Sequence, residues 1–581
     1  MTAEVPLVVG GAPSDGVESS ADVSRTATVL GWAWRHAPVL TMGIELALAA
    51  AFLIYQSTRL WFSADDWDFL IDRDLSHHTL RMLFAPHGGH WSTLPILSYR
   101  ALFHIVGLRS YLPYALVDIA LHIAVCILLW FLLRRTGLGA WITTGVVGVM
   151  AFLGAGAENL LWDFQVGFVG AVAFGLLALL IVDRDTPRFG GRDAWAWAAA
   201  IASLMCSAVG LAMLVTLGLF VWLRRGLRTA LAITIVPLAA YLVWYVAIGH
   251  EHGSMVHHAG QYLQVPAYMW TGLTAVWEQV SGLPNSGAVI LAMLVVPLLL
   301  SHTGDRLATL AIAGIGGAVA LFLVIGFVRV GLGLDQAKSS RYIYVAAALT
   351  IPAFAWLVQW IAQRTQGRAH VAAAAFALLV ALFVVNGIQL AVSFADKRVQ
   401  DLAGRKDRLI AAAQLVRSGD RTLGGLVDTI PGPTLSAANL KNHTIQAAIP
   451  SKPVTRQGLL DAAAFLQVGV SRTPIPGVPP AESVRWNGIS GRPAFVGCEI
   501  GTVTSARPTI TVQLGSDGGM IQMAAGTPRV NVALVQDGLT SVASEPKVWP
   551  AVPYYIASVA RDAQLRVTFR APGRVGVCTG P

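Results

Sequence analysis

Long apolar runs recur along most of this chain, and they limit its fold more than any other feature. Thr229 to Gly249 and Leu307 to Val328 are each about as long as the roughly 20 residues that a helix needs to cross some 30 Å of hydrocarbon. With 55% hydrophobic and 13% charged residues, the chain is too apolar for an ordinary soluble protein. Because lipid offers no partner to backbone polar groups, the sequence predicts a polytopic, all-α membrane domain.

The formal net charge of +9 is carried in part by arginines in short loops between these runs. The positive-inside rule gives this distribution, and no basic recognition motif accompanies the charge, so nucleic acid is not an expected partner. Residues 1–36 are polar and lack the early apolar core of a signal peptide, which predicts a disordered cytoplasmic tail.

The membrane domain is expected over 37–394, with about eleven spans and a cytoplasmic N-terminus because Arg35 precedes the first span. The stretch 193–223 could be one overlong helix or two short helices broken near Ser207 and Gly210. Two helices are preferred, because one would put the following arginines outside. The expected spans are 37–55, 111–133, 141–153, 166–182, two within 193–223, 229–249, 287–300, 307–328, 342–361 and 371–394.

An odd number of spans leaves 395–581 outside the cytosol. The cysteines Cys498 and Cys578 bracket the last stretch of this region, and a disulfide between them fits an oxidising compartment. Alternating apolar and polar residues, as in 530–535, predict strands after a first helical part. A β-sandwich that binds sugars and a structural cap both remain open interpretations. Cys126 and Cys206 lie in apolar runs and are expected to be buried thiols.

Candidate catalytic residues lie in the first outer loop, residues 56–110. Asp65, Asp66 and Asp68 follow the first span directly, and carboxylates at a membrane edge need a cationic, metal or proton-donating partner. The alternative is an ordinary solvated loop. Further along, His87 and His90 flank two glycines and could serve a metal, a phosphate or a sugar hydroxyl. A structural zinc site is disfavoured, because no cysteine or third histidine lies close in sequence.

Two later segments are expected at the same membrane level. One contains Glu158 and Gln165, and the other contains Lys338, Arg341 and Tyr342 at the start of a span. An arginine at a helix N-terminus is a suitable phosphate receiver, although interfacial anchoring would also explain it. Carboxylates, imidazoles and cations on one face beside apolar surface suit transfer from a lipid-phosphate donor.

These segments together resemble the GT-C superfamily of integral-membrane glycosyltransferases, which includes the mycobacterial arabinofuranosyltransferases. The resemblance implies a polyprenyl-phosphate sugar donor, a cell-envelope acceptor and, usually, inversion. Asp65 or Asp66 would be the general base, and Lys338 and Arg341 would hold the donor phosphate. The Ala/Gly/Val/Arg-rich usage is typical of a high-GC actinobacterium.

The same resemblance implies lesser roles for other residues. His87, His90, Glu158, Gln165 and Tyr342 would help to bind the donor or the acceptor. Asp66 and Asp68 would hold a divalent cation, Mg or Mn, if one is used. The histidine-rich loop 251–258 could be a mobile lid or a surface cluster without a role.

Two rival functions remain open. A transporter or flippase needs ionisable groups deep in its spans, and Asp118 and His122 are the main candidates, although a structural hydrogen-bonded pair would explain them as well. A non-catalytic envelope-assembly protein would bind its partner through the β-rich domain.

Overall fold

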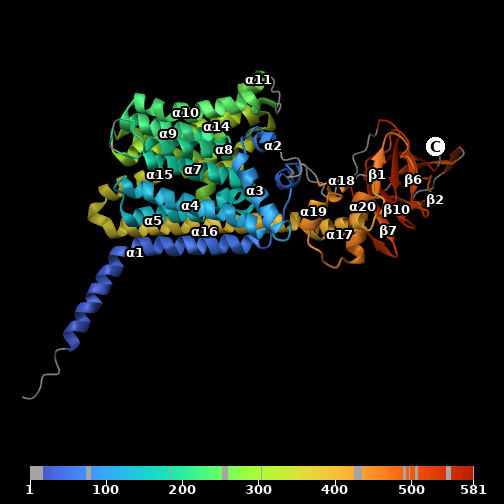
Figure 1. Ribbon diagram of the computed structural model, residues 1–581, viewed down its shortest axis with the longest axis horizontal. Helices are drawn as coiled ribbons and strands as arrows, with labels where there is room; N and C mark the ends of the chain where they lie inside the picture. Colours follow the sequence, from blue (N-terminus) through green and yellow to red (C-terminus); the bar gives the residue numbers. More distant parts are fainter. Residues whose placement is uncertain are drawn as a thin grey trace, which may run out of the picture.

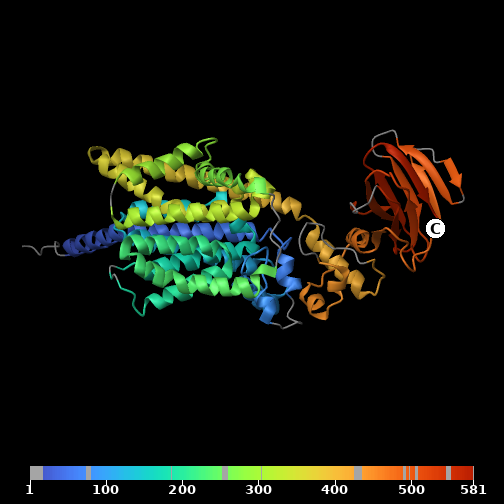
Figure 2. The same cartoon turned by 90° about the horizontal axis from the view of Figure 1, so that it is seen from above.

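The computed structural model places three parts in line along its long axis: a helical bundle, a small helical segment and a β-sandwich (Figures 1 and 2). The structure describes residues 18–73, 80–184, 186, 188–251, 259–301, 304–423, 435–487, 492–495, 497–503, 508–544 and 551–579.

The bundle contains the apolar runs as helices. Its α-helices are α1 Glu18–Ser57, α2 Leu80–Phe84, α3 Thr93–Val106, α4 Leu112–Arg135, α5 Ala140–Ala151, α6 Ala157–Leu161, α7 Val166–Val182, α8 Asp193–Cys206, α9 Val209–Arg225, α10 Leu227–Ala247, α11 Ala259–Tyr262, α12 Val265–Ser281, α13 Gly287–Leu300, α14 Arg306–Arg329, α15 Ser340–Arg364 and α16 Ala369–Asp401. Short π or 3-10 segments are η1 Asp68–Asp72, η3 Gly154–Gly156, η4 Asp163–Gln165, η5 Gly249–Glu251, η6 Val330–Leu332, η7 Leu334–Lys338 and η8 Gln366–Arg368.

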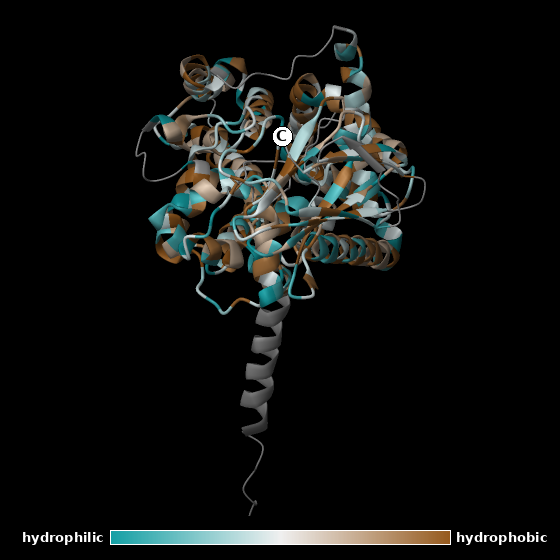
Figure 3. Ribbon diagram, turned by 90° about the vertical axis from the view of Figure 1, so that its right-hand side faces the viewer, coloured by the Kyte–Doolittle hydropathy of each residue, from teal (hydrophilic) through white to brown (hydrophobic). Residues whose placement is uncertain are grey.

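Eight helical stretches among the described residues are long and apolar enough to cross a membrane, and three shorter helices are apolar as well. The predicted multi-pass, mostly helical fold is therefore confirmed, while the total of eleven spans stays a prediction. Figure 3 looks along the long axis from the β-sandwich end and shows hydrophobic residues in many of the helices behind it. Helix α1 begins at Glu18, within the stretch 1–36 that was expected to be a disordered tail; residues 1–17 lie outside the described residues.

The predicted break within 193–223 is confirmed. Helix α8 ends at Cys206, Ser207 is extended with φ −170° and ψ 160°, and α9 begins at Val209. Asp193 at the start of α8 binds Arg225 at the end of α9 through two contacts of 3.0 Å, so the two helices form a hairpin. The Ser207 break is the closed end of that hairpin.

Helices α7 and α15 lie at the centre of the bundle, where every residue from Tyr342 to Leu357 is buried. Close packing there depends on small residues, as is common between membrane helices. Gly154 in η3 and Gly387 in α16 meet backbone to backbone, so a methyl group at either glycine would overlap a carbonyl oxygen of the other segment.

The helical segment after the bundle consists of α17 Arg405–Arg417, α18 Ala437–Leu440, α19 His443–Ala448 and α20 Arg456–Leu466. It rests on the bundle, because the Leu108 backbone N–H donates to the Ala448 carbonyl at 2.9 Å and Lys406 lies 4.2 Å from the Trp61 ring.

The predicted β-rich domain is confirmed as two antiparallel sheets around one hydrophobic core. One sheet has the order β1-β9-β6-β11-β4-β3 and the other β2-β5-β10-β7-β8. Cys498 and Cys578 lie opposite one another on β4 and β11 and form the predicted disulfide. The strands are β1 Val468–Ser471, β2 Ser483–Asn487, β3 Arg492–Phe495, β4 Cys498–Val503, β5 Thr509–Gln513, β6 Gly519–Met523, β7 Val530–Gln536, β8 Leu539–Thr540, β9 Tyr554–Ser558, β10 Gln564–Phe569 and β11 Gly573–Cys578.

The contact between Gly154 and Gly387 leads to a first prediction. Gly387→Ala should lower the stability of the detergent-solubilised protein by about 1–3 kcal/mol, because the added methyl group forces η3 and α16 apart. Thermal unfolding measures this loss. Gly43→Ala is the control, since nothing lies within 4 Å of its new methyl group; an equal loss in both variants would contradict the packing argument.

Candidate functional site

Five segments meet at one end of the bundle, next to the C-terminal helical segment: the loop after α1, the turn before α3, the η4 segment, the α8–α9 break and the start of α15. In Figure 1 this end carries the labels α2 and α3. Most of the polar side chains singled out in the sequence lie in these segments.

Asp66 is fully buried, and its carboxylate ties the loop after α1 to helix α3 and to the start of the η4 segment. Its oxygens accept hydrogen bonds from the Ser63 backbone N–H at 2.7 Å, the Tyr99 hydroxyl at 2.8 Å and Trp162 Nε1 at 3.2 Å. Burial raises the pKa of Asp66 to about 6, while these donors and the charge of Arg398 act in the opposite direction. The carboxylate is therefore ionised at neutral pH and anchors the loop.

Asp65 has the opposite environment. It is partly exposed, and its side chain makes no hydrogen bond or ion pair with any residue that the structure describes. The preceding Ala64 has a φ of 52°, a strained value for a residue with a side chain. The strained turn, fixed by Asp66, thus leaves the neighbouring carboxylate available for a ligand.

Asp68 belongs to a buried charge cluster. Its carboxylate accepts from His87 Nδ1 at 2.5 Å and lies 3.3 Å from Arg73 Nη2. Burial acts to raise the pKa of Asp68, but the hydrogen bond from His87 and the charge of Arg73 outweigh it and hold the pKa below its usual value. Arg73 also donates to the carbonyls of Met82, Ala85 and Pro86, which fixes the chain leading to the histidines.

The two histidines bracket a tight turn. His87 and His90 exchange backbone hydrogen bonds of 3.1 and 2.8 Å across Gly88 and Gly89, whose φ values of 54° and 84° are those that glycine adopts without strain. His90 Nδ1 accepts from the Ala208 backbone N–H at 3.2 Å and contacts Ser207 Oγ at 3.3 Å, at the α8–α9 break.

The protonation of the second histidine follows from these contacts. Burial and the nearby charges of Arg329, His87 and Arg341 lower the pKa of His90 to about 3, so the ring is neutral. Since Nδ1 accepts a hydrogen bond, the proton of the neutral ring is on Nε2, which is a donor without a partner among the described residues. A small cavity of about 30 Å³ lies beside both rings, lined also by Phe164 and Gln165.

The segments around Glu158 and Arg341 contact each other. This agrees with the prediction that they lie at the same membrane level. Glu158 accepts from Ser339 Oγ at 3.2 Å and lies 3.4 Å from Arg341 Nε, at the N-terminus of α15. Ser340 Oγ also donates to the Ala155 carbonyl at 2.8 Å. A carboxylate therefore already balances the charge of Arg341 and the helix dipole there.

Arg329 is a cation that the sequence analysis missed. It ends α14 next to the histidine turn, since a methyl group at Gly88 would lie 3.9 Å from Arg329 Nη2. Its guanidinium makes no hydrogen bond or ion pair within the part of the chain that the structure describes. The fully buried Tyr268 hydroxyl, also without a partner there, interacts electrostatically with both Arg329 and Arg341. Unpaired donors thus face the region beside His90.

The remaining predicted residues have different positions. Tyr342 is buried, with the Arg341 guanidinium 5.7 Å from its ring, and Gln165 is buried with no partner for its side-chain oxygen among the described residues. Lys338 is half exposed and pairs with Asp335 at 2.9 Å, which places it in a surface ion pair. Residues 252–258 of the possible lid lie outside the described residues.

The predicted cation site at Asp66 and Asp68 stays a prediction. Hydrogen bonds or ion pairs occupy both carboxylates, and the described residues contain no group of three or more histidine, cysteine, aspartate or glutamate side chains placed to hold a metal ion.

Asp118 and His122 do not form the expected hydrogen-bonded pair. His122 instead contacts the Tyr344 hydroxyl at 2.9 Å and the Ala151 carbonyl at 3.2 Å, while the buried Asp118 carboxylate has no partner among the described residues. The free Cys126 and Cys206 are buried, as predicted.

Of the residues missed in the sequence, Arg329 and Arg398 lie beside segments far along the chain, whereas the partners of Arg73 belong to its own loop. Arg73 was an ordinary charged loop residue in sequence, and Arg398, which donates to Ser63 Oγ at 2.6 Å, was part of a charged helix. The sequence did contain a signal for Arg329. It follows a span that was expected to end on the outer side, where the positive-inside rule predicts few basic residues, so an arginine there is unusual.

Comparisons with known proteins give only remote matches. No family model and no curated protein matches the chain. Among solved structures, ArnT from Cupriavidus metallidurans in the apo state is 15% identical, with a TM-score of 0.41, 75% of this chain covered and 88% of that chain. For the same protein bound to undecaprenyl phosphate, the values are 14%, 0.39, 66% and 81%.

The arabinosyltransferase EmbB from Mycobacterium smegmatis is 14% identical, with a TM-score of 0.29, 92% of this chain covered and 64% of that chain. Arabinosyltransferases are among the groups named in the sequence resemblance. At such low TM-scores these matches carry no argument about function, so the proposal below depends on the residues of the site.

The Arg73 cluster leads to a second prediction. Arg73→Met should destabilise the protein by about 3–5 kcal/mol, because it leaves the buried Asp68 carboxylate without its cation and frees three carbonyls. Arg59→Met is the matched control. It removes the exposed ion pair with Asp396 and should cost about 1 kcal/mol or less. Thermal unfolding in detergent compares them, and equal losses would contradict the role given to burial.

Proposed function

We propose that this protein is a membrane glycosyltransferase that moves a sugar from a polyprenyl-phosphate donor to a cell-envelope acceptor at the outer face of the membrane. The observation that carries the proposal is the pair of adjacent carboxylates in different environments, with Asp66 buried and hydrogen-bonded on both oxygens and Asp65 without a partner among the described residues. Arg329, a cation without a partner among the described residues, lies next to the histidine turn at the same end of the bundle.

Asp65 is the proposed general base. Its unpartnered carboxylate can accept the proton of an acceptor hydroxyl, whose oxygen then attacks the anomeric carbon of the donor sugar. The bond between that carbon and the phosphate oxygen breaks, and polyprenyl phosphate leaves. Asp66 is a positioning residue, since its hydrogen bonds hold the strained turn that presents Asp65. A single displacement of this kind inverts the anomeric centre.

The leaving phosphate is proposed to bind at Arg329, with Arg341, the Tyr268 hydroxyl and His90 Nε2 as further donors. Arg329 supports this role because it has no competing anion within the described residues, whereas Glu158 shares Arg341. Lys338, half exposed and paired with Asp335, is left out of this set.

The outer location is proposed from the basic residues at the opposite end of the bundle. Arg184 and Arg225 bind Asp193 at the open end of the α8–α9 hairpin, and Arg306 donates to the Arg135 carbonyl. Under the positive-inside rule this end is cytoplasmic. The site beside Ser207, at the closed end of the same hairpin, would then lie outside.

A third prediction tests the activity itself. Purified wild type should transfer radiolabelled sugar from at least one of a panel of polyprenyl-phosphate sugars to a crude envelope acceptor. Asp65→Asn should lower kcat by about 10²-fold or more while the protein still folds, because the base is lost. Running the assay with Mg²⁺, with Mn²⁺ and with a chelator tests the predicted cation.

One arginine variant and one lysine variant distinguish the proposed phosphate site from a surface charge. Arg329→Gln should lower kcat/KM by about tenfold or more, because a charge-assisted hydrogen bond is lost. Lys338→Gln should change it little. If the wild type transfers no sugar from a broad panel, the transferase proposal fails and lipid translocation becomes the next activity to measure.

The fourth prediction concerns pH. Because the pKa of Asp66 is raised to about 6, the carboxylate gains a proton as the pH falls through that value and loses an acceptor position in its network. Transfer should therefore decline below about pH 6. Arg398→Gln removes a charge that lowers this pKa, so the decline should begin at a higher pH. An unchanged pH–rate profile in this variant would contradict the role of Asp66.

A further inference from the structure

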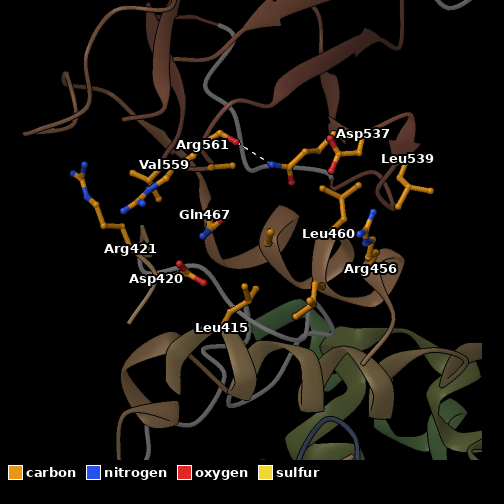
Figure 4. A pocket seen from close by; sticks show the side chains of 14 residues that line it. Leu415, Asp420, Arg421, Arg456, Leu460, Gln467, Asp537, Leu539, Val559 and Arg561 are labelled. Carbon is orange, nitrogen blue, oxygen red and sulfur yellow. Dashed lines mark hydrogen bonds between the residues drawn. The ribbon is translucent and has the colours of Figure 1, made fainter. Parts of the chain in front are cut away.

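A second candidate site lies outside the bundle, where the helical segment meets the β-sandwich (Figure 4). A cavity of about 470 Å³ opens there, a volume within the range of small-molecule sites. Its walls come from α17, α20, the β7–β8 turn and the chain after β9. Neither the sandwich nor the helices alone would form it.

The cavity has an aliphatic floor and a polar rim. Leu415, Leu459 and Leu460 from the helices and Val559 from the sandwich form the floor. Three arginines, Arg421, Arg456 and Arg561, and two aspartates, Asp420 and Asp537, form the rim. Figure 4 shows these charged side chains around the opening, with Gln467 between them.

The rim contains both arginines and aspartates, but several of these side chains do not pair with one another. The exposed side chains of Arg456, Arg561 and Asp537 make no hydrogen bond or ion pair with any described residue, and the Gln467 side-chain amide makes none either. Gln467 is 8% exposed as a residue, and its side-chain amide is free to bind a ligand in the cavity. A cavity with an aliphatic floor and polar side chains that have no protein partner offers those side chains to a ligand.

The walls themselves are fixed. Asp461 on α20 accepts from the Val542 backbone N–H at 2.8 Å, and Gln457 donates to the Thr540 carbonyl at 3.0 Å. On the other side, Gln536 donates to the Arg561 carbonyl at 3.0 Å, the bond drawn in Figure 4. The opening is therefore built into the contact between the two parts.

The cavity is lined by both hydrogen-bond donors and hydrogen-bond acceptors, and this mixture indicates which class of ligand it can bind. Arginine only donates hydrogen bonds, aspartate only accepts them, and glutamine does both. A simple anion would satisfy the arginines but would face Asp420 and Asp537. A chain of hydroxyl groups satisfies all of them, because each hydroxyl both donates and accepts, and its C–H faces can cover the leucines.

We propose that this cavity binds a glycan segment. The choice of a glycan over a peptide, whose backbone also donates and accepts, rests on the proposed function: a polymer bound here would be held beside the end of the bundle that carries the site. The cavity would then be a docking site for the acceptor, separate from the reacting groups.

The test is binding by the full-length, detergent-solubilised protein to an array of arabino-, manno-, galacto- and glucooligosaccharides that also carries a peptide library. Wild type should bind at least one oligosaccharide series. Arg456→Ala combined with Arg561→Ala should weaken that binding by about tenfold or more, because two charge-assisted donors are lost.

Arg566→Ala is the matched control, since Arg566 is an exposed arginine on β10 that does not line the cavity. It should leave binding unchanged, and thermal unfolding should show that both variants fold. The proposal is overturned if no oligosaccharide binds, if the double variant binds as well as wild type, or if peptides or inorganic phosphate compete away the sugar.

The binding assay needs no catalysis, so its outcome and that of the transfer assay are distinguishable. Asp65→Asn should bind the oligosaccharide as wild type does. The double variant should keep its transfer to a short soluble acceptor while losing efficiency with a polymer, seen as a higher KM. Loss of both would point to misfolding, which the unfolding control detects.

Discussion

The arrangement at the end of the bundle that carries the candidate site depends on one buried carboxylate. Asp66 accepts hydrogen bonds from its own loop, from α3 through Tyr99 and from the segment before α7 through Trp162. An ionised group without water is tolerated only when its lone pairs are filled, so the three elements must keep their spacing. Arg398 extends the restraint to α16 by donating to Ser63 and lying over the Trp162 ring.

This restraint gives two neighbouring aspartates different environments. Asp66 is occupied on both oxygens, and the strained turn at Ala64 leaves Asp65 unpartnered among the described residues. A similar division holds for the histidines. His87 is fixed by Asp68 through Nδ1, whereas His90 is held neutral with a donor on Nε2. The chemistry that each of these side chains can perform therefore depends on its burial and its hydrogen-bond partners, not on its residue type alone.

Specific residues show how far sequence reasoning reached. The break at Ser207, the Cys498–Cys578 disulfide, the strands of the last domain and the shared level of Glu158 and Arg341 were all predictable, because hydropathy, charge rules and alternation are local signals. The partners of Asp68, the placement of Arg329 and the cavity around Gln467 were not. The last two join residues from distant parts of the chain, and the partners of Asp68 are brought to it by the folding of one loop. No local sequence pattern encodes these contacts.

Although α12, Val265–Ser281, was not among the expected spans, the sequence by itself determined that the chain crosses a membrane many times, where most of its long apolar helices lie, and that its last domain is β-rich. These follow from the cost of placing polar groups in lipid and from side-chain periodicity. Only the tertiary structure decided which aspartate is an anchor and which is available, and that Arg329 rather than Lys338 stands beside the histidines. Those choices depend on hydrogen bonds and burial between segments, which exist only after the helices have packed.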